Sequence, residues 1–255
     1  EAFYDAAHAF NYAERYQMPV IHLMDKALAS TTRTVPPFDL HAVRIDRGQV
    51  ATPPAEGNGH VPYPRFALTE SGISPRPLLG QPGGMHWLTG GEHTEVGLVT
   101  EDPEIRERMM EKRARKLELV LQQLPQEEKF QIYGAPDAPF TILSWGSNKG
   151  AIQEALQRLE ADGIAARLVQ VRLLWPFPGA ALMPLLDSAH PLVVVELNFS
   201  GQFAHLLREE TGRTPDHLVV KYNGRPFSGQ ELYRAFQAIH SGKSEHRVVV
   251  RNPYE

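Results

Sequence analysis

Short apolar runs alternate with stretches of helical periodicity from Pro139 to the end of the chain. The runs 140–145, 165–171, 192–195 and 218–222 are typical of buried strands, and no hairpin signal separates the first two. Apolar residues at helical spacing follow each run, and the capping box Ser228-Gly-Gln-Glu231 opens the last helix. This alternation predicts an α/β fold over residues 139–255, with a mostly parallel sheet covered by helices on both faces.

The first 35 residues resemble the end of another α/β unit. Residues 2–16 carry apolar groups at helical spacing, and Met18 to Met24 is an apolar run that predicts a short strand ending at Asp25. One helix and one strand do not make a domain, and the chain begins with Glu1 in place of methionine. We therefore expect residues 1–35 to be the C-terminal end of a larger unit whose earlier part lies upstream.

A long connector follows, for which regular structure is not expected. Half of the chain's 20 glycines and almost half of its 21 prolines lie between Pro36 and Gly97. Connectors of this length are uncommon unless they are disordered or functional. Apolar residues predict that residues 36–104 pack on a surface as a linker; they are Tyr63, Phe66, Leu68, Ile73, Leu78, Met85 and Trp87.

Residues 105–124 are predicted to form a surface helix within a connecting segment, 105–138. The expected buried stripe consists of Met110, Leu117, Leu121 and Leu124. A basic cluster on this helix allows two interpretations, a nucleic-acid patch or a solvated face. We favour the solvated face, because glutamates offset the charge and no aromatic residues interleave. The cluster contains Lys112, Arg113, Arg115 and Lys116.

Charge and composition exclude several classes of function. The net charge of −4 provides no overall positive field for nucleic acid or anionic lipid. The chain shows neither an apolar run long enough for a membrane span nor a signal peptide, so a cytoplasmic protein without membrane or nucleic-acid partners is expected. The absence of cysteine excludes disulfides, a cysteine nucleophile, thiolate zinc sites and a cysteine-ligated iron–sulfur cluster in this chain.

The loop Gly146-Ser-Asn-Lys-Gly150 connects the first predicted strand and helix of the sheet domain. Free backbone amides at such a position can hold an anion, with Ser147 and Lys149 as candidate ligands. The loop matches neither the Walker nor the Rossmann glycine pattern. The alternative is a glycine turn in which Ser147 caps the following helix.

The segment Glu196-Leu-Asn-Phe-Ser-Gly-Gln202 ends an apolar strand and opens a helix. Its position predicts that Glu196, Asn198 and Gln202 lie at the carboxyl edge of the sheet, where such folds bind ligands. In the alternative interpretation, Asn198 and Ser200 are turn and cap residues, and Glu196 pairs with a basic neighbour.

Glu92-His93-Thr94-Glu95 brings two carboxylates and an imidazole together in a glycine-rich loop. Such a cluster could share a cation or a proton. A structural or catalytic zinc site needs three or four protein ligands at defined spacing, so we favour hydrogen bonding over metal binding.

A set of short motifs spread over almost the whole chain carries a family resemblance. The motifs are Ala9 to Val20 with Asp25-Lys26, Tyr63-Pro-Arg-Phe66, Thr69, Gly72-Ile-Ser-Pro-Arg76, Glu92-His93 with Glu95 and Gly97, Lys112-Arg113 with Lys116, Gly146-Ser147 with Lys149-Gly-Ala151, Pro176-Phe-Pro178, and Glu196 with Asn198, Gly201 and Gln202. In this order they resemble the alpha subunit of 2-oxoacid:ferredoxin oxidoreductases, most closely the 2-oxoglutarate (KorA-like) branch. No single motif is decisive, and the match depends on their co-occurrence.

The resemblance implies an enzyme that decarboxylates a 2-oxoacid, here 2-oxoglutarate, with thiamine diphosphate. Electrons pass through a [4Fe-4S] cluster to ferredoxin, and the acyl group passes to coenzyme A. The resemblance also implies that a beta subunit holds most of the thiamine diphosphate, its Mg and the cluster, so that this portion binds none of them alone.

For the fold, the resemblance implies the end of a pyrimidine-binding domain over residues 1–35. The linker over 36–104 and a connecting helix and loop over 105–138 follow. Residues 139–255 would then form a three-layer αβα domain like the transketolase C-terminal domain.

In the family, the catalytic glutamate and the substrate loop lie upstream of the residues present here. No catalytic residue is therefore expected in this chain, and it is expected to be inactive alone. Arg65, Arg76 and His93 are candidates for contact with the 2-oxoacid, coenzyme A or a subunit interface, because guanidinium groups suit carboxylates and phosphates. The alternative is that both arginines bind backbone carbonyls of the linker. Two other interpretations are a subunit-interface module and a component of another thiamine enzyme, such as a transketolase or an E1 component.

Overall fold

The computed structural model describes residues 1–53, 62–135, 137–186 and 190–251. It divides into two compact units. The first contains residues 1–22 and 34–123, and the second contains residues 23–33 and 124–255. The first unit thus groups the predicted linker with the N-terminal helix and the long helix that follows the linker.

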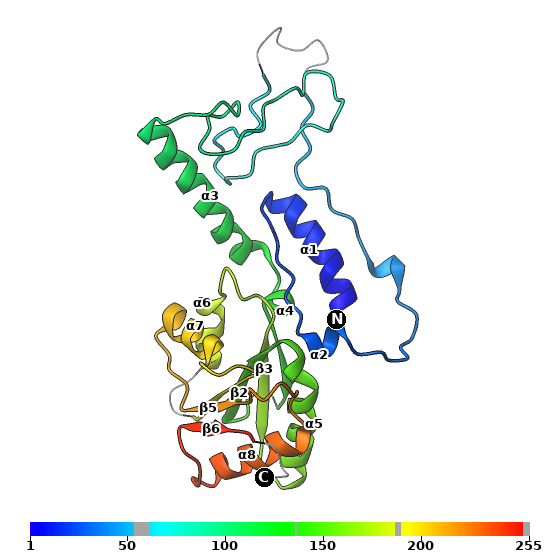
Figure 1. The fold of residues 1–255 in the computed structure, drawn as a ribbon, viewed down its shortest axis with the longest axis vertical. Coiled ribbons are helices and arrows are strands. Elements are labelled where there is room, and N and C mark those ends of the chain that lie inside the picture. The colour runs from blue at the N-terminus through cyan, green and yellow to red at the C-terminus, as the bar shows by residue number, and fades with distance from the viewer. Residues whose placement is uncertain (54–61, 136, 187–189, 252–255) are drawn as a thin grey trace. The chain divides into compact units, whose positions relative to one another are not determined.

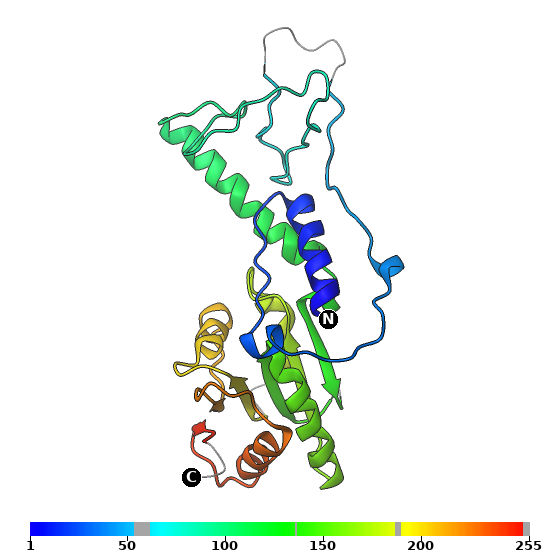
Figure 2. The same ribbon diagram turned by 45° about the vertical axis from the view of Figure 1, so that its right-hand side comes forward.

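The first unit contains helix α1 (Ala2–Tyr16), a 3₁₀ turn η1 (Leu40–Ala42) and the long helix α3 (Pro103–Gln123). Helix α3 starts where proline suits the first helical position, and Asp102 Oδ1 accepts a hydrogen bond from the Glu104 amide 2.9 Å away. The described residues of the linker between η1 and α3 are irregular, with isolated bridges between Val50 and Arg76 and between His93 and Val99. Figure 2 shows α3 extending from these linker loops.

The buried residues of α3 are Met109, Lys112 and Val120. The linker contacts the helix at Lys112, whose Nζ donates to the Phe66 carbonyl and to Ser74 Oγ. The predicted stripe was wrong at Met110, which is 47% exposed. The predicted solvated face was wrong as well, because Lys112 is only 5% exposed. At Gly72 (φ +76°) the linker approaches the helix so closely that an added Cβ would lie 2.5 Å from the Lys112 carbonyl oxygen.

The predicted strand over Met18 to Met24 is absent from the structure. This segment has no strand partner among the described residues, and four of its apolar side chains are exposed: Val20, Ile21, Leu23 and Met24. An apolar run forms a strand only where a neighbouring strand pairs with its backbone and covers its side chains. The short helix α2 (Lys26–Ala29) follows, with Asp25 as its N-cap.

The second unit is a six-stranded sheet with the order β1-β3-β2-β4-β5-β6 (Figure 1). The strands are β1 (Phe130–Gly134), β2 (Phe140–Trp145), β3 (Ala166–Val171), β4 (Leu192–Glu196), β5 (His217–Val220) and β6 (Arg247–Val249). Only the edge strand β1 is antiparallel to its neighbour. The helices are α4 (Gln126–Lys129), α5 (Lys149–Ala161), α6 (Gly179–Leu182) with the 3₁₀ turn η3 (Met183–Leu185), α7 (Gln202–Thr211) and α8 (Gly229–His240).

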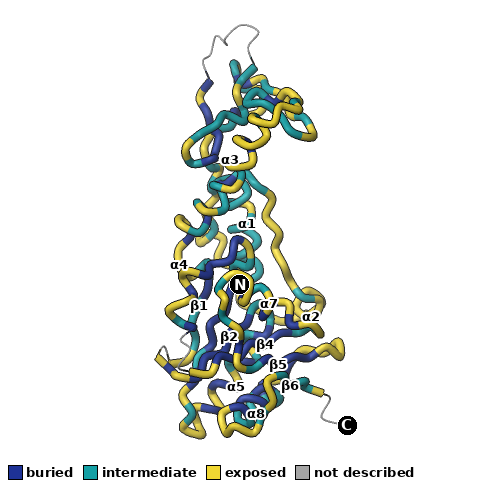
Figure 3. The backbone as a smooth tube through the Cα atoms, turned by 90° about the vertical axis from the view of Figure 1, so that its left-hand side faces the viewer, coloured by how far each residue is buried: buried dark blue, intermediate teal, exposed yellow. Residues whose placement is uncertain are grey.

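Helices cover both faces of this sheet, which confirms the predicted three-layer α/β arrangement. Helices α5 and α8 pack on one face, where Ile142 and Phe236 belong to the same apolar cluster. Helices α6 and α7 pack on the other face around Leu143 and Leu207. The central strands β2 and β4 are therefore buried over almost their whole length, as Figure 3 shows in dark blue.

The local signals of the second unit were also confirmed, with one difference. The capping box of Ser228 and Glu231 forms at the start of α8, and Gly212 ends α7 in a left-handed conformation. The helix expected around Leu182 is instead one turn of α-helix followed by a 3₁₀ turn. Within the described residues, no helix is long and apolar enough to cross a membrane.

Candidate functional site

The turn after β2 has the predicted glycine geometry but a different cap. Gly146 has a φ of +67°, and Gly146–Asn148 forms the 3₁₀ turn η2 that leads into α5. The N-cap of α5 is Asn148, so the prediction that Ser147 caps this helix was wrong. Lys149 is the first residue of α5, and its Nζ lies 5.2 Å from the centroid of the Tyr133 ring.

A buried polar cluster lies beside this turn, at the carboxyl end of β2. Ser144 Oγ donates to the Val195 carbonyl at 2.7 Å, and Asn148 Nδ2 donates to Ser144 Oγ at 3.3 Å. Asn148 Oδ1 and Gln170 Oε1 are buried without a hydrogen-bond donor in the described part of the chain. Ser144 and Gln170 are register partners on adjacent strands, so this edge of the sheet offers acceptor oxygens to a buried water or another donor.

Glu196 ends β4 with a fully buried carboxylate. Its Oε2 accepts from the Phe203 amide at 2.8 Å, and its Oε1 accepts from the Ala204 amide at 3.1 Å. The alternative in which Glu196 pairs with a basic neighbour was therefore wrong, because amides at the start of α7 satisfy the carboxylate. Asn198 is a turn residue, as the alternative proposed: its Oδ1 accepts from the amides of Gly201 and Gln202.

In the first unit, Arg65 and His93 both lie close to the ring of Phe66. The guanidinium carbon of Arg65 lies 5.4 Å from the centroid of the Phe66 ring. The His93 and Phe66 ring centroids are 4.0 Å apart, and His93 Nδ1 lies 3.1 Å from the Thr94 carbonyl oxygen. Arg65 also donates from Nη1 to Gln17 Oε1 at 2.8 Å, and burial lowers the pKa of its guanidinium.

Two lysines of α3 join the same network. Lys112 Nζ donates to the Phe66 carbonyl at 2.9 Å and to Ser74 Oγ at 2.6 Å. Lys116 Nζ donates to the Gln17 carbonyl at 3.0 Å, and Gln17 Nε2 donates to the Ser74 carbonyl at 2.6 Å. Burial, followed by repulsion from neighbouring cations, lowers the pKa of both lysines to about 8.

We call this group the Gln17 cation cluster; it consists of Arg65, Lys112 and Lys116 around Gln17 and Ser74. Gln17 follows α1 with a φ of +51°. It is the one non-glycine residue with positive φ among the described residues. An unusual backbone conformation of this kind persists where surrounding contacts hold it, here the hydrogen bonds of the cluster.

Glu92 forms an ion-pair network beside the cluster rather than a metal site. Arg113 Nη2 lies 2.6 Å from Glu92 Oε1, and Arg106 Nη1 lies 2.9 Å from Glu92 Oε2. The hydrogen bonds from Arg113 chiefly hold the pKa of Glu92 at about 2, well below its usual range. The other carboxylate, Glu95, accepts a hydrogen bond from the Leu68 amide at 2.8 Å. The described residues include no group of three or more histidine, cysteine, aspartate or glutamate side chains suited to a metal ion.

Arg76 does not join the Gln17 cation cluster. Its Nη2 forms an ion pair with Glu14 of α1 and donates to the Arg47 carbonyl at 3.3 Å. The Arg76 amide donates to the Gln49 carbonyl, and the Arg76 carbonyl accepts from the Ala51 amide. These contacts match the alternative in which this arginine holds the linker in place.

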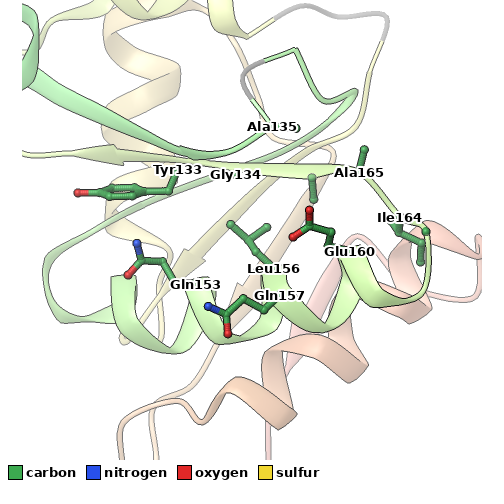
Figure 4. A pocket seen from close by; sticks show the side chains of 11 residues that line it. Tyr133, Gly134, Ala135, Gln153, Leu156, Gln157, Glu160, Ile164 and Ala165 are labelled. Atoms are coloured by element: carbon green, nitrogen blue, oxygen red, sulfur yellow. The ribbon is translucent and has the colours of Figure 1, made fainter.

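A separate pocket lies in the second unit. It has a volume of about 570 Å³ and opens between the end of β1, the start of β3 and α5 (Figure 4). Its polar lining side chains are Tyr133, Gln153, Gln157 and Glu160. None of the residues predicted for binding lines it.

Sequence reasoning missed the role of the α3 lysines and of Gln17. A signal for the lysines was present, because Lys112 and Lys116 occupy the same helical stripe as the apolar Met109 and Val120. Charged residues within an apolar stripe indicate burial with specific partners rather than a solvated face. No local signal marks Gln17, since its role depends on residues from the linker and from α3.

Two family models match the chain. Residues 1–112 match the thiamine diphosphate-binding domain of pyruvate flavodoxin/ferredoxin oxidoreductases. Residues 138–232 match core domain II of pyruvate:ferredoxin oxidoreductase.

Curated relatives are similar over nearly the whole chain. The 2-oxoacid:ferredoxin oxidoreductase 2 alpha subunit of Aeropyrum pernix is 45% identical over 98% of this chain and 38% of its own length. The 2-oxoacid:ferredoxin oxidoreductase alpha subunit of Saccharolobus solfataricus is 40% identical over 98% of this chain and 39% of its own length. The chain thus spans less than half the length of these relatives.

Among solved structures, the 2-oxoglutarate:ferredoxin oxidoreductase of Magnetococcus marinus, with 2-oxoglutarate, coenzyme A and succinyl-CoA bound, is similar to this chain. The TM-score is 0.77 and the sequence identity is 33%. The match covers 89% of this chain and 38% of that one.

Proposed function

The chain belongs to the alpha subunits of 2-oxoacid:ferredoxin oxidoreductases, and from this membership we propose that it acts as part of such a subunit. The reaction is the oxidative decarboxylation of a 2-oxoacid, with the acyl group transferred to coenzyme A and the electrons to ferredoxin. The observation that carries this proposal is 45% identity maintained over 98% of the chain. Because the chain spans 38% of that relative, the activity is assigned to the whole subunit with its partners.

We propose 2-oxoglutarate as the substrate and coenzyme A as the acyl acceptor. The similar structure from Magnetococcus marinus contains 2-oxoglutarate, coenzyme A and succinyl-CoA, which supports this choice over other 2-oxoacids. A beta subunit and ferredoxin would be the protein partners, in the cytoplasm.

One of the proposed cofactors does not fit the residues of this chain. A [4Fe-4S] cluster is held by cysteine thiolates, and the chain contains no cysteine, so its residues do not fit that group. We therefore propose that a beta subunit holds the cluster. We propose that the same subunit holds the Mg of thiamine diphosphate, as the family resemblance implies.

The contribution of this chain is binding and positioning. In the linker, Arg65 and His93 lie close to Phe66, and Arg65 can offer N–H groups to a carboxylate or a phosphate. In the second unit, Ser147 and Lys149 stand at the turn after β2, where a ligand can approach the carboxyl edge of the sheet. Glu196 and Asn198 instead organise the start of α7, while Gln202 is its exposed first residue.

The test begins with the gene product at its natural length, tagged in its host and purified with its partners. We expect a brown complex that contains a cysteine-bearing second subunit and reduces ferredoxin only when a 2-oxoacid and coenzyme A are both supplied. A colourless complex with a thiamine-dependent activity would favour another thiamine enzyme. A colourless protein without such activity would favour a subunit-interface module.

Comparison of 2-oxoacids in the same assay tests the proposed substrate. We expect the highest kcat/KM with 2-oxoglutarate. An equal or higher value with pyruvate would contradict the assignment to 2-oxoglutarate while leaving the reaction class in place.

A further inference from the structure

The three positive groups of the Gln17 cation cluster donate their hydrogen bonds to uncharged oxygen atoms. The hydrogen bonds of Arg65 and Lys116 go to the side-chain and backbone oxygens of Gln17. Those of Lys112 go to a carbonyl and a hydroxyl. No carboxylate accepts a hydrogen bond from these three groups in the described part of the chain.

The nearby carboxylates are engaged elsewhere. Glu92 forms ion pairs with Arg106 and Arg113. Glu95 accepts a hydrogen bond from the Leu68 amide, and its negative charge also attracts Lys112. The cluster therefore retains an excess of positive charge in a partly buried setting. Burial, followed by repulsion from neighbouring cations, lowers the pKa of both lysines to about 8.

The cations also retain donor capacity. A guanidinium has five N–H groups and an ammonium has three. In the described residues, Arg65 has one side-chain hydrogen bond and Lys116 has one. Both side chains are of intermediate burial, so an incoming group can reach them, whereas Lys112 lies deeper at 5% exposed.

We propose that the Gln17 cation cluster is a binding site for an oxyanion group of a small molecule, with Arg65 and Lys116 as direct ligands and Lys112 as the deeper charge. An oxyanion supplies both the negative charge and the hydrogen-bond acceptors that the cluster lacks. Two sources share this chemistry, a carboxylate of the 2-oxoacid and a phosphate of coenzyme A. These two sources rest on the proposed function, but the anion site itself does not.

The experiment uses the full-length complex with its partner subunits and the variant Lys116→Gln, which removes the charge but keeps a donor for the Gln17 carbonyl. Arg108→Gln is the matched control, because Arg108 is an exposed cation on the same helix. Binding of 2-oxoglutarate, coenzyme A and inorganic phosphate is measured by calorimetry. Phosphate serves as a probe that needs no enzymatic activity.

We expect Lys116→Gln to weaken the binding of phosphate, and to weaken the binding of one of the two substrates about tenfold, because a charged hydrogen-bond donor to the oxyanion is lost. Arg108→Gln should change neither. Weaker coenzyme A binding would assign the phosphate as the ligand, and weaker 2-oxoglutarate binding would assign the carboxylate. Lys116→Arg, which keeps the positive charge, should bind phosphate and both substrates with affinities close to those of the wild type.

Unchanged affinities for all three compounds in folded Lys116→Gln would overturn the proposal. A failure of subunits to assemble in Lys116→Gln but not in Arg108→Gln would also overturn it, because the occupant would then be an acidic group of a partner. If Lys116→Gln does not fold, Arg65→Gln replaces it with the same criteria. If the wild-type complex binds phosphate but shows no oxidoreductase activity, the proposed function is contradicted and the anion site is not.

Discussion

Glu196→Gln tests whether the carboxylate at the end of β4 holds the start of α7. Glu196 is fully buried and accepts hydrogen bonds from Asn198 Nδ2 and from the amides of Phe203 and Ala204. A glutamine has one acceptor oxygen, so its NH₂ group must face at least one of these N–H donors. A buried donor without an acceptor costs about 1–3 kcal/mol, and each remaining bond loses about 1 kcal/mol when the charge is removed.

Part of this loss is offset, because burying a neutral amide costs less than burying a carboxylate. We therefore expect the free energy of unfolding to fall by about 2–4 kcal/mol in Glu196→Gln. With a urea m-value of about 2 kcal/mol per M, the unfolding midpoint should fall by about 1–2 M. Hydrogen exchange should also accelerate at the Phe203 and Ala204 amides.

Gln202→Ala is the matched control, because Gln202 is exposed in the same turn. We expect its unfolding midpoint to remain close to that of the wild type. A Glu196→Gln midpoint no lower than that of the control, with an unchanged m-value, would refute the role assigned to the carboxylate. Protection of the two amides at the wild-type level would refute it independently.

Three further predictions concern the first unit. Because Arg113 lowers the pKa of Glu92 from 4.5 to about 2, Glu92 stabilises the folded state above about pH 4.5 and loses this effect as the pH falls toward 2. The difference in unfolding free energy between wild type and Glu92→Gln should therefore shrink over that pH range, and a constant difference would contradict the ion pair. Gly72→Ala should lower the melting temperature, because its Cβ would lie 2.5 Å from a carbonyl oxygen of α3. Gly90→Ala should leave the melting temperature unchanged, because no atom lies within 4 Å of the added Cβ. Equal effects of the two substitutions would refute the close approach at Gly72. Arg76→Ala should lower the melting temperature of the full complex without raising KM for either substrate, because Arg76 pairs with Glu14, and a raised KM would show direct contact with a substrate.

The binding residues were predictable only in part. Arg65 and His93 were identified as residue types suited to acids, and the structure places both beside Phe66. Arg76 had the same local chemistry, but it lies against Glu14 of α1. The difference between the two arginines depends on which segments the fold brings near each of them, and no pattern along the linker records that information.

The sequence by itself determined the α/β architecture of the second unit. Helical and strand periodicities are local properties, so the alternation after Pro139, the capping box of Ser228 and the glycine that ends α7 could all be read from neighbouring residues. The tertiary structure alone decided the outcome where a partner is distant in sequence. Met18 to Met24 is not a strand because none of the described segments pairs with it. Lys112 and Lys116 do not form a solvated face, because oxygens of the linker and of Gln17, 38 to 99 residues away, bind their ammonium groups.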